Sequence, residues 1–214
     1  EGGREFGRQA YVGLADATYG TLTFGRQYDS VVDYLAQATA NGNWAGYLFA
    51  HPYDNDNTDN SFRVNNTIKY ASPDFAGLQF GGTYSFSNDT NFANNRQYSL
   101  GGQYTHGPFA LGVAYLQANN IYGSTGGTWT SSYDGTFSSS INQGFATAQN
   151  MQIIAASSTY LIGAVTLGVS YSNTQYKASS FSLFKGKETF NSAGATASWQ
   201  VNPELRVAAG YDYT

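Results

Sequence analysis

The residues that could do chemistry in this 214-residue chain are few, and the densest group is a short run of carboxylates. Asp54, Asp56 and Asp59 are separated only by Asn and Thr residues. Carboxylate oxygens at such spacings can ligate calcium. The twelve-residue calcium loop, however, carries Gly at its sixth position and Glu at its twelfth, where this run has Asp59 and Asn65. Calcium binding is therefore an alternative, and a polar loop turn is the stronger interpretation.

Hydrolytic chemistry would need a nucleophile, a base and an orienting group brought together in space. The histidines are poor candidates for the base: His51 stands beside Pro52 in a long polar segment, and His106 beside Gly107 in a tight turn. The chain has no cysteine, which excludes disulfides and thiolate metal sites. These residues favour a protein that is not an enzyme, and nothing in them requires a cofactor.

The composition is unusual for a protein surrounded by water. Charged residues make up 11% of the chain, against about 25% in ordinary soluble domains. Aromatic residues make up 16%, which argues against disorder. The acidic isoelectric point near 4.9 disfavours nucleic-acid binding, and no apolar run approaches the ~20 residues of a membrane-spanning helix. An all-β protein with little surface charge remains.

Strict alternation of apolar and polar residues identifies the strands. In 78–86 and 165–172 the apolar or aromatic side chains share one face, while Gln, Thr, Ser and Gly take the other. The segments around 109–115 and 205–213 alternate in the same way. Weaker candidates lie near 9–16, 20–28, 62–71, 96–105, 150–160 and 190–200. About ten strands of roughly 8–11 residues result, which is the length a tilted strand needs to cross a bilayer.

The connections alternate between short and long. Tight turns rich in Gly, Pro, Asn and Asp lie at 17–20, 72–77, 105–108 and 201–204. Polar and mostly longer segments lie near 29–61, 87–95, 117–149 and 173–189. This asymmetry is typical of outer-membrane barrels, and aromatic residues near the strand ends suit their interfacial girdles. A soluble sandwich and an eight-stranded lipocalin-like barrel are the alternatives, but neither pairs short turns with loops this long so regularly.

Three stretches resemble consecutive strands of the general diffusion porins of Gram-negative outer membranes, particularly the β-proteobacterial branch. They are 8–14, 24–29 and 65–78, and the ordered resemblance covers essentially the whole chain. It implies an antiparallel up-and-down transmembrane β-barrel, sixteen-stranded when complete, that assembles as a homotrimer. At about 21 residues per strand, such a barrel needs roughly 340 residues. We therefore expect residues 1–214 to be a single barrel domain, incomplete at both ends, running from about the fourth strand to the thirteenth.

The resemblance also implies a function. The expected activity is passive diffusion of small hydrophilic solutes and ions across the bacterial outer membrane, in contact with outer-membrane lipid and lipopolysaccharide and not with nucleic acid. A solute-selective channel for sugars or anions is one alternative, and a soluble lipocalin-like binding barrel is another. The inward positions are mainly Gly, Ser, Thr and Gln rather than a row of aromatics, which favours the unselective channel.

In this family the third long loop folds into the barrel and sets carboxylates against arginines on the wall. By order that loop is 29–61, which we expect to form the constriction. Parity within 62–71 puts Phe62 and Val64 outside and Arg63 inside, and by parity alone Lys69 also lines the lumen. For Arg26, parity and resemblance disagree, and we follow the resemblance. The expected pore-lining residues are Arg63, Arg26, Lys69, Asp54, Asp56, Asp59, Asp29 and Asp33.

Alternation predicts which side chains face lipid or a neighbouring subunit and which face the barrel interior. The outward set is Val64, Ile68, Leu78, Phe80, Tyr84, Leu111, Val113, Leu167, Val169, Val207 and Ala209. The inward set is Gln79, Thr83, Ser85, Gln103, Thr166 and Ser170. Arg206 is expected to point inward near the short-turn end, and Arg96 to lie at the rim.

Overall fold

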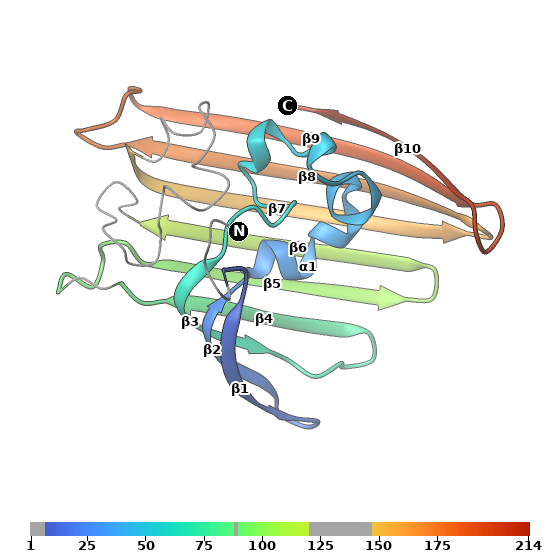
Figure 1. Ribbon diagram of the computed structural model, residues 1–214, viewed down its shortest axis with the longest axis horizontal. Helices are drawn as coiled ribbons and strands as arrows, with labels where there is room; N and C mark the ends of the chain where they lie inside the picture. The colour runs from blue at the N-terminus through green and yellow to red at the C-terminus, as the bar shows by residue number, and fades with distance from the viewer. Residues whose placement is uncertain (1–6, 88–89, 120–146) are drawn as a thin grey trace.

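The computed structural model describes residues 7–87, 90–119 and 147–214, which form one sheet with a helical segment on its concave face (Figure 1). The strands are β1 (Ala10–Asp16), β2 (Gly20–Gln27), β3 (Val64–Ala71), β4 (Leu78–Ser85), β5 (Gln97–His106), β6 (Phe109–Asn119), β7 (Ala148–Ile162), β8 (Val165–Ala178), β9 (Lys187–Gln200) and β10 (Arg206–Tyr213). The predicted strand segments are confirmed, with ends that move by a few residues.

The strands pair in chain order as a 10-stranded antiparallel meander. Within the described residues the sheet is open, with β1 and β10 at its edges. The short turns gather at one end of the sheet and the longer connections at the other (Figure 1). The predicted all-β up-and-down class is confirmed. One connection is shorter than expected, because β8 continues to Ala178 and β9 begins at Lys187, inside the segment 173–189 expected to be a loop.

The two faces of the sheet divide as alternation predicts over most of its width. Outward side chains such as Phe80, Val113 and Val169 are exposed, while inward Thr83 and Ser85 are buried. Inward Gln103 donates from Nε2 to Oε1 of Gln79, its direct partner on β4, at 2.6 Å. The apolar face therefore points away from the concave side, and the polar face lines it.

Phe62 and Val64 are exceptions, and the prediction that they point outward is wrong. Phe62 is fully buried and Val64 is 1% exposed. Alternation fails here because Asn66 has a positive φ of 53°, and the pairing of β2 with β3 shifts between Gly25 and Gln27. Such a bulge moves the residues before it to the opposite face.

The segment between β2 and β3 contains the helical structure of the described residues. It forms helix α1 (Ser30–Tyr34) and short turns at Ala36–Ala38, Asn41–Ala45, Gly46–Phe49 and Pro52–Asp54. In Figure 1 these turns lie in front of the sheet. No helix in the described part of the chain combines the length and apolar character that crossing a bilayer requires.

Candidate functional site

The inner loop, residues 29–61, contacts the concave face of the sheet at two separate places. The first anchor is residues 29–35, where α1 packs against β4, β5 and β6. Its apolar side chains, Val31 and Leu35, join a buried cluster that includes Leu116 and Ile153 on the inner faces of β6 and β7. The Ser30 backbone N–H donates to Ser99 Oγ at 3.0 Å, which fixes the start of the helix on β5.

Three inward-facing glycines form the seat of Tyr34 at the end of α1. A methyl group placed at Gly81 would lie 2.5 Å from the Tyr34 hydroxyl, and one at Gly101 would lie 2.6 Å from its ring. A methyl group at Gly112 would overlap the Tyr34 carbonyl oxygen. Gly81 and Gly101 are direct partners, so the seat is a bare strip across neighbouring strands. Only residues without a Cβ allow the loop backbone to approach the wall this closely.

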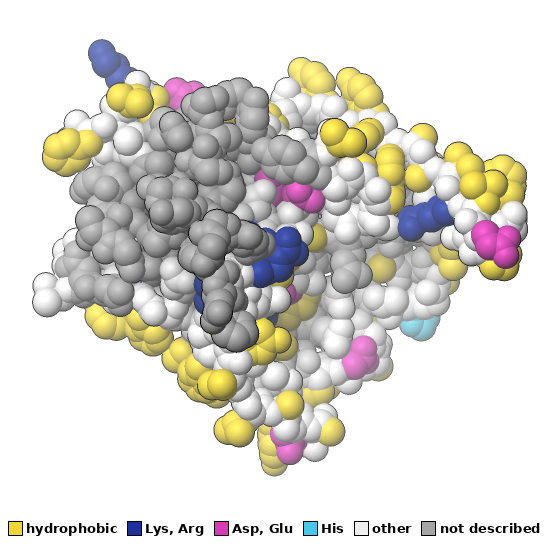
Figure 2. Space-filling model, in the orientation of Figure 1, with side chains coloured by type: hydrophobic (Ala, Val, Ile, Leu, Met, Phe, Trp, Pro, Cys, Tyr) yellow, Lys and Arg dark blue, Asp and Glu magenta, His cyan; other side chains and the backbone are white. Residues whose placement is uncertain are grey.

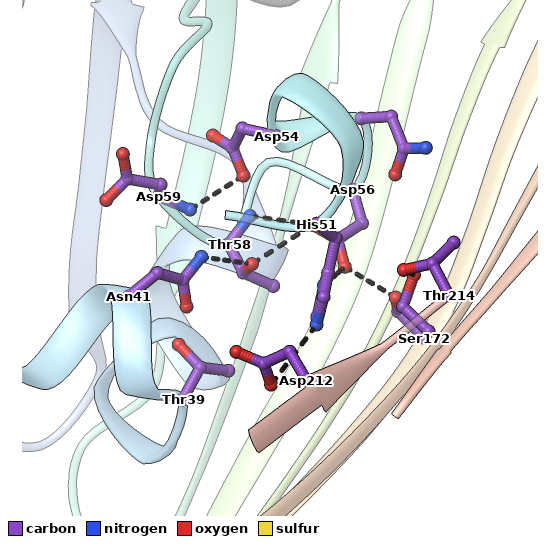
Figure 3. A network of polar contacts seen from close by, with 12 residues as sticks. Thr39, Asn41, His51, Asp54, Asp56, Thr58, Asp59, Ser172, Asp212 and Thr214 are labelled. Carbon is purple, nitrogen blue, oxygen red and sulfur yellow. Dashed lines mark hydrogen bonds and ion pairs between the residues drawn. The ribbon is translucent and has the colours of Figure 1, made fainter. Parts of the chain in front are cut away.

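The second anchor is residues 51–59, and it is held by buried polar groups (Figure 3). His51 Nδ1 lies 2.5 Å from Asp56 Oδ2, and that oxygen also accepts from Ser172 Oγ on β8 at 2.5 Å. His51 Nε2 lies 3.7 Å from Asp212 Oδ1 on β10. His51 is 4% exposed and Asp56 is fully buried. The anchor therefore ties the loop to two strands on the far side of the sheet from α1.

The other loop acids build the loop itself. Asp54 accepts from the Asp59 N–H at 2.8 Å and from the Ser61 N–H at 2.9 Å. Asp29 caps α1 by accepting from the Val31 N–H at 2.8 Å, and its second oxygen accepts from Asn57 Nδ2 at 2.7 Å. The Asn57 amide thus joins the beginning of the loop to its end.

Electrostatics in the second anchor follow from burial and pairing. The neighbouring Asp56 and Asp212 carboxylates outweigh burial and raise the pKa of His51 to about 10, so the imidazole is cationic at neutral pH. Burial acts against ionisation of Asp56 as well, but His51 holds the pKa of that carboxyl below its usual value. Burial raises the pKa of Asp54 well above its usual value, and the Asp56 charge adds to this effect. His51 and Asp56 therefore form a buried ion pair.

The structure corrects the expectation that all the loop acids line the pore. Asp29, Asp54 and Asp56 have no exposed surface, because their oxygens bond to the loop and to the wall beneath it. The Asp33 side chain, by contrast, is 25% exposed and pairs with Lys69 Nζ, whose side chain is 17% exposed. Asp59 is also partly exposed, although burial raises the pKa of its carboxyl.

The two arginines expected in the constriction have other contacts. Arg63 is 8% exposed, with Nη1 donating to the Ser61 carbonyl at 3.1 Å and its guanidinium carbon 5.5 Å from the centre of the Tyr28 ring. Arg26 donates from Nε to the Gly7 carbonyl at 3.0 Å and from Nη1 to Asn65 Oδ1 at 2.8 Å. These contacts brace the ends of the loop where it leaves β2 and joins β3.

An open hollow of about 310 Å³ lies between the loop and the wall, near the short turns. Most of its side chains are neutral and polar, among them Gln103, Ser157, Thr159 and Thr166. Beside it, Arg206 Nη2 donates to Asn43 Oδ1 of the loop at 2.9 Å and to Ser198 Oγ at 3.0 Å. The expectation that Arg206 points inward is confirmed. Among the described residues, Figure 2 shows only a few charged side chains on this face.

Neither alternative chemistry gains support from the geometry. Within the described residues, no group of three His, Asp or Glu side chains is placed to hold a metal ion. Ser172 donates to Asp56 rather than to His51, so the buried serine and histidine do not form a nucleophile–base pair.

Comparison with known proteins identifies the family. The family model described as Gram-negative porin matches residues 1–214. The chain belongs to the Gram-negative porins. It is 35% identical over 129 residues to an outer membrane porin protein of Bordetella pertussis, a match covering 55% of this chain and 33% of that protein. Membership of this family places the chain in the bacterial outer membrane. Members of this family are porins, and the chain is not an enzyme.

Solved structures share the fold. The anion-selective porin from Comamonas acidovorans matches with a TM-score of 0.66 and 21% identity, over 99% of this chain and 58% of that one. Salmonella typhi OmpF, in complex with daunomycin, matches with a TM-score of 0.62 and 21% identity, over 95% of this chain and 58% of that one. The porin chain described here thus spans a third of its Bordetella relative and 58% of each of these two structures.

Sequence reasoning missed the residues that attach the loop to the wall. The sequence presents His51 only as a poor candidate for a catalytic base, and its contacts with Asp56 and Asp212 were not predicted. Alternation does place Ser172 on the inward face of β8, and the same rule applied to β10 places Asp212 there, but nothing in the sequence pairs either residue with the loop. The Tyr34 seat also had a signal, because Gly81 and Gly101 fall on the inward face of their strands.

Proposed function

We propose that this porin is a passive, water-filled channel through which small hydrophilic solutes and ions cross the outer membrane. The observation that carries the proposal is the inner loop, which covers part of a polar concave face while the opposite face of the same sheet is apolar. A barrel closed from such a sheet has a wet interior and a lipid-facing exterior. The inner loop narrows that interior.

The charges that face the water are the partly exposed ones. Asp33 on the loop and Lys69 on the wall form a partly exposed ion pair between α1 and β3. Asp59 and Arg206 add one charge of each sign at other points of the inner surface. In a narrow pore these groups act on solutes more strongly than surface charges do, because the effective dielectric constant is lower.

We further propose that the complete barrel has sixteen strands and assembles as a homotrimer surrounded by outer-membrane lipid. The open edges of β1 and β10 support closure by further strands, because unpaired backbone groups are costly in lipid. Neutral hydroxyl and amide groups in the hollow beneath the loop support an unselective channel rather than a solute-specific one.

Planar-bilayer recordings on the full-length protein test the proposal. We expect long-lived, ohmic conductance steps that come in groups of three. Conversion of Asp33 to Asn together with Lys69 to Gln should leave the channel open and change its ion preference little, because the pair is neutral overall. A protein that folds in detergent but conducts nothing would contradict the channel.

A further inference from the structure

The hollow between the inner loop and the wall contains hydroxyl groups that have no partner among the described residues. They belong to Thr105, Ser157, Thr159 and Thr166. Within the described part of the chain, no side-chain or backbone group forms a hydrogen bond with any of these four hydroxyls. Elsewhere on the inner face hydroxyls pair directly, as Thr83 Oγ1 does with Ser99 Oγ at 2.6 Å. The hollow therefore gathers hydrogen-bonding groups that a bound solute can use.

The inner loop closes one end of the hollow. A methyl group placed at Gly112 would lie 2.2 Å from the Tyr34 carbonyl oxygen, so the loop backbone covers the wall at this point. Ser157, the direct partner of Gly112 on β7, is only 4% exposed. One step nearer the short turns, Ala110 stands between its two direct partners, Thr105 and Thr159. Its single methyl group leaves a depression with a hydroxyl on each side.

The hollow opens towards the short turns. Thr105 is exposed and lies next to the β5–β6 turn, and Thr166 lies next to the β7–β8 turn. Ala38 and Asn43 of the inner loop line the side that faces the wall. In outer-membrane barrels the short turns are on the periplasmic side. A solute therefore reaches the hollow from the periplasmic side of the inner loop.

The lining suits a neutral, polyhydroxylated solute better than an ion. None of the described residues that line the hollow is charged. Hydroxyl groups both donate and accept, as sugar hydroxyls do, whereas an anion only accepts and gains most from a cation. Gln103 Nε2 donates to Gln79, which leaves its amide oxygen as a further acceptor for a solute hydroxyl. Arg206, the cation beside the hollow, already donates to Asn43 and Ser198.

The size of the hollow limits the solute to one ring. Its volume of about 310 Å³ is at the lower end of the ~300–1,000 Å³ that ligand pockets occupy. Sugar hydroxyls replace ordered water at little cost where they reproduce its hydrogen bonds. The hollow is open and buries only part of such a ring, so its affinity is low.

We propose that the hollow is a weak binding site for a single neutral sugar ring on the periplasmic side of the inner loop. The ring lies over Ala110, and its hydroxyls bond to those of Thr105, Thr159 and Thr166. The proposal deepens the proposed function, on which it rests, because it names a solute class that is held inside the same channel. The site lies between loop and wall, so a bound sugar slows its own passage without excluding other solutes.

Saturation-transfer NMR tests the site, with methyl β-glucoside titrated into the full-length protein in a detergent without sugar headgroups. We expect saturable binding in the millimolar range that a ligand of this size reaches in an open site. Gluconate, an anion of similar size, should bind more weakly. Binding that rises linearly with concentration, without saturation, would overturn the site.

The hydroxyls are tested by a change that keeps their shape. Thr159→Val removes one hydroxyl and should weaken binding about two- to tenfold, the range for one neutral hydrogen bond. Thr21→Val is the matched control, because Thr21 is an inward threonine of β2 near the short turns that does not line the hollow. An equal loss in both variants would assign the binding to the inner surface in general and contradict a site.

The space over Ala110 is tested by filling it. Ala110→Met should abolish saturable binding, whereas Ala195→Met, at an exposed position of β9, should not. Unchanged binding by Ala110→Met would place the sugar elsewhere. Tighter binding of gluconate that Arg206→Gln removes would make the hollow an anion site and overturn the neutral sugar. Wild-type conductance recorded without sugar separates the two proposals: a conducting protein that binds no sugar contradicts only this site.

Discussion

The two anchors of the inner loop both attach it to the wall of the sheet, but they do so through different interactions. The first anchor holds α1 by apolar packing on Leu116 and Ile153 and by close approach to glycines. The second anchor holds its segment with a buried ion pair, His51 and Asp56, and with the Ser172 hydroxyl. Apolar packing tolerates changes of pH and salt, whereas a buried ion pair depends on the protonation of both partners.

The difference shows what the loop charges are for. In the first anchor the charged group that faces α1 from the wall is Lys69, which pairs at a partly exposed site with Asp33. In the second anchor the carboxylates of Asp54 and Asp56 are buried beneath the loop. The acids of the second anchor therefore serve attachment, whereas Asp33 in the first anchor stays partly exposed beside Lys69.

The largest expected effect is on the second anchor. Replacing His51 with Gln leaves the Asp56 carboxylate buried without its ion-pair partner, which costs about 3–5 kcal/mol. Amide hydrogen exchange of residues 51–59 should rise strongly, while that of α1 changes little. The double variant His51→Gln with Asp56→Asn removes both charges and should recover much of the loss. If α1 exchanged as fast as residues 51–59 in His51→Gln, the two anchors would be one cooperative unit.

The first anchor is tested at its glycine seat. Gly112→Val places a side chain where the Tyr34 carbonyl lies, and overpacking of this kind costs about 1–3 kcal/mol. We expect α1 to leave the wall, amide exchange over 30–35 to rise, and single-channel conductance to increase because the constriction widens. Ala195→Val, which adds the same side chain at an exposed position of β9, three strands away, is the control. A Gly112→Val channel with wild-type conductance would mean that α1 does not narrow the pore.

Much of the fold could be predicted from alternation. In a strand between lipid and water, apolar and polar side chains alternate, because successive side chains point to opposite faces. That rule failed at Phe62 and Val64, where Asn66 and the register shift on β2 break the repeat. A single bulge residue carries no clear sequence signal. The inference that Arg63 points inward because its neighbours point outward therefore lost its basis at that position.

The site was harder to predict than the fold. Carboxylates in a polar loop indicate charge, but burial depends on which part of the loop touches the wall. Asp56 is buried because Ser172, 116 residues further along the chain, donates to it, and no local pattern contains that contact. The Tyr34 seat is likewise made by glycines on three different strands. Contacts between distant segments decide which acids face water.

The pH dependence of the second anchor is the next test. The pKa of His51 is raised to about 10, so its contribution is complete below its ordinary value of 6.5 and is lost as the pH rises through 10. The pKa of Asp56 is lowered, so its contribution is present above 3.8 and is lost as the pH falls through its lowered value. Asp54, with a raised pKa, contributes most below 3.8 and less as the pH rises.

These signs predict that protection of residues 51–59 is greatest near pH 4 and declines towards pH 10. The difference in protection between the wild type and His51→Gln tests the histidine: it should shrink as the pH rises from about 6.5 towards 10. The first anchor should show no such trend above pH 6.5, since apolar contacts hold it. A difference that stayed constant to pH 10 would show that His51 is not held as a cation by Asp56.

The smallest expected effect compares two cations on the wall, Lys69 and Arg63. The Lys69 side chain is 17% exposed, and its removal leaves the partly exposed Asp33 carboxylate without its partner. Lys69→Gln should therefore shift the reversal potential in a salt gradient towards cation preference. The cation-to-anion permeability ratio should rise by up to about fivefold, because a part-exposed ion pair is worth up to ~1 kcal/mol. Arg63 is 8% exposed and lies against Tyr28, so Arg63→Gln should shift the potential less. The measurement belongs at low salt, where screening is weakest. A larger shift from Arg63→Gln than from Lys69→Gln would show that Arg63 lines the constriction. It would also show that the Asp33–Lys69 pair does not control ion preference.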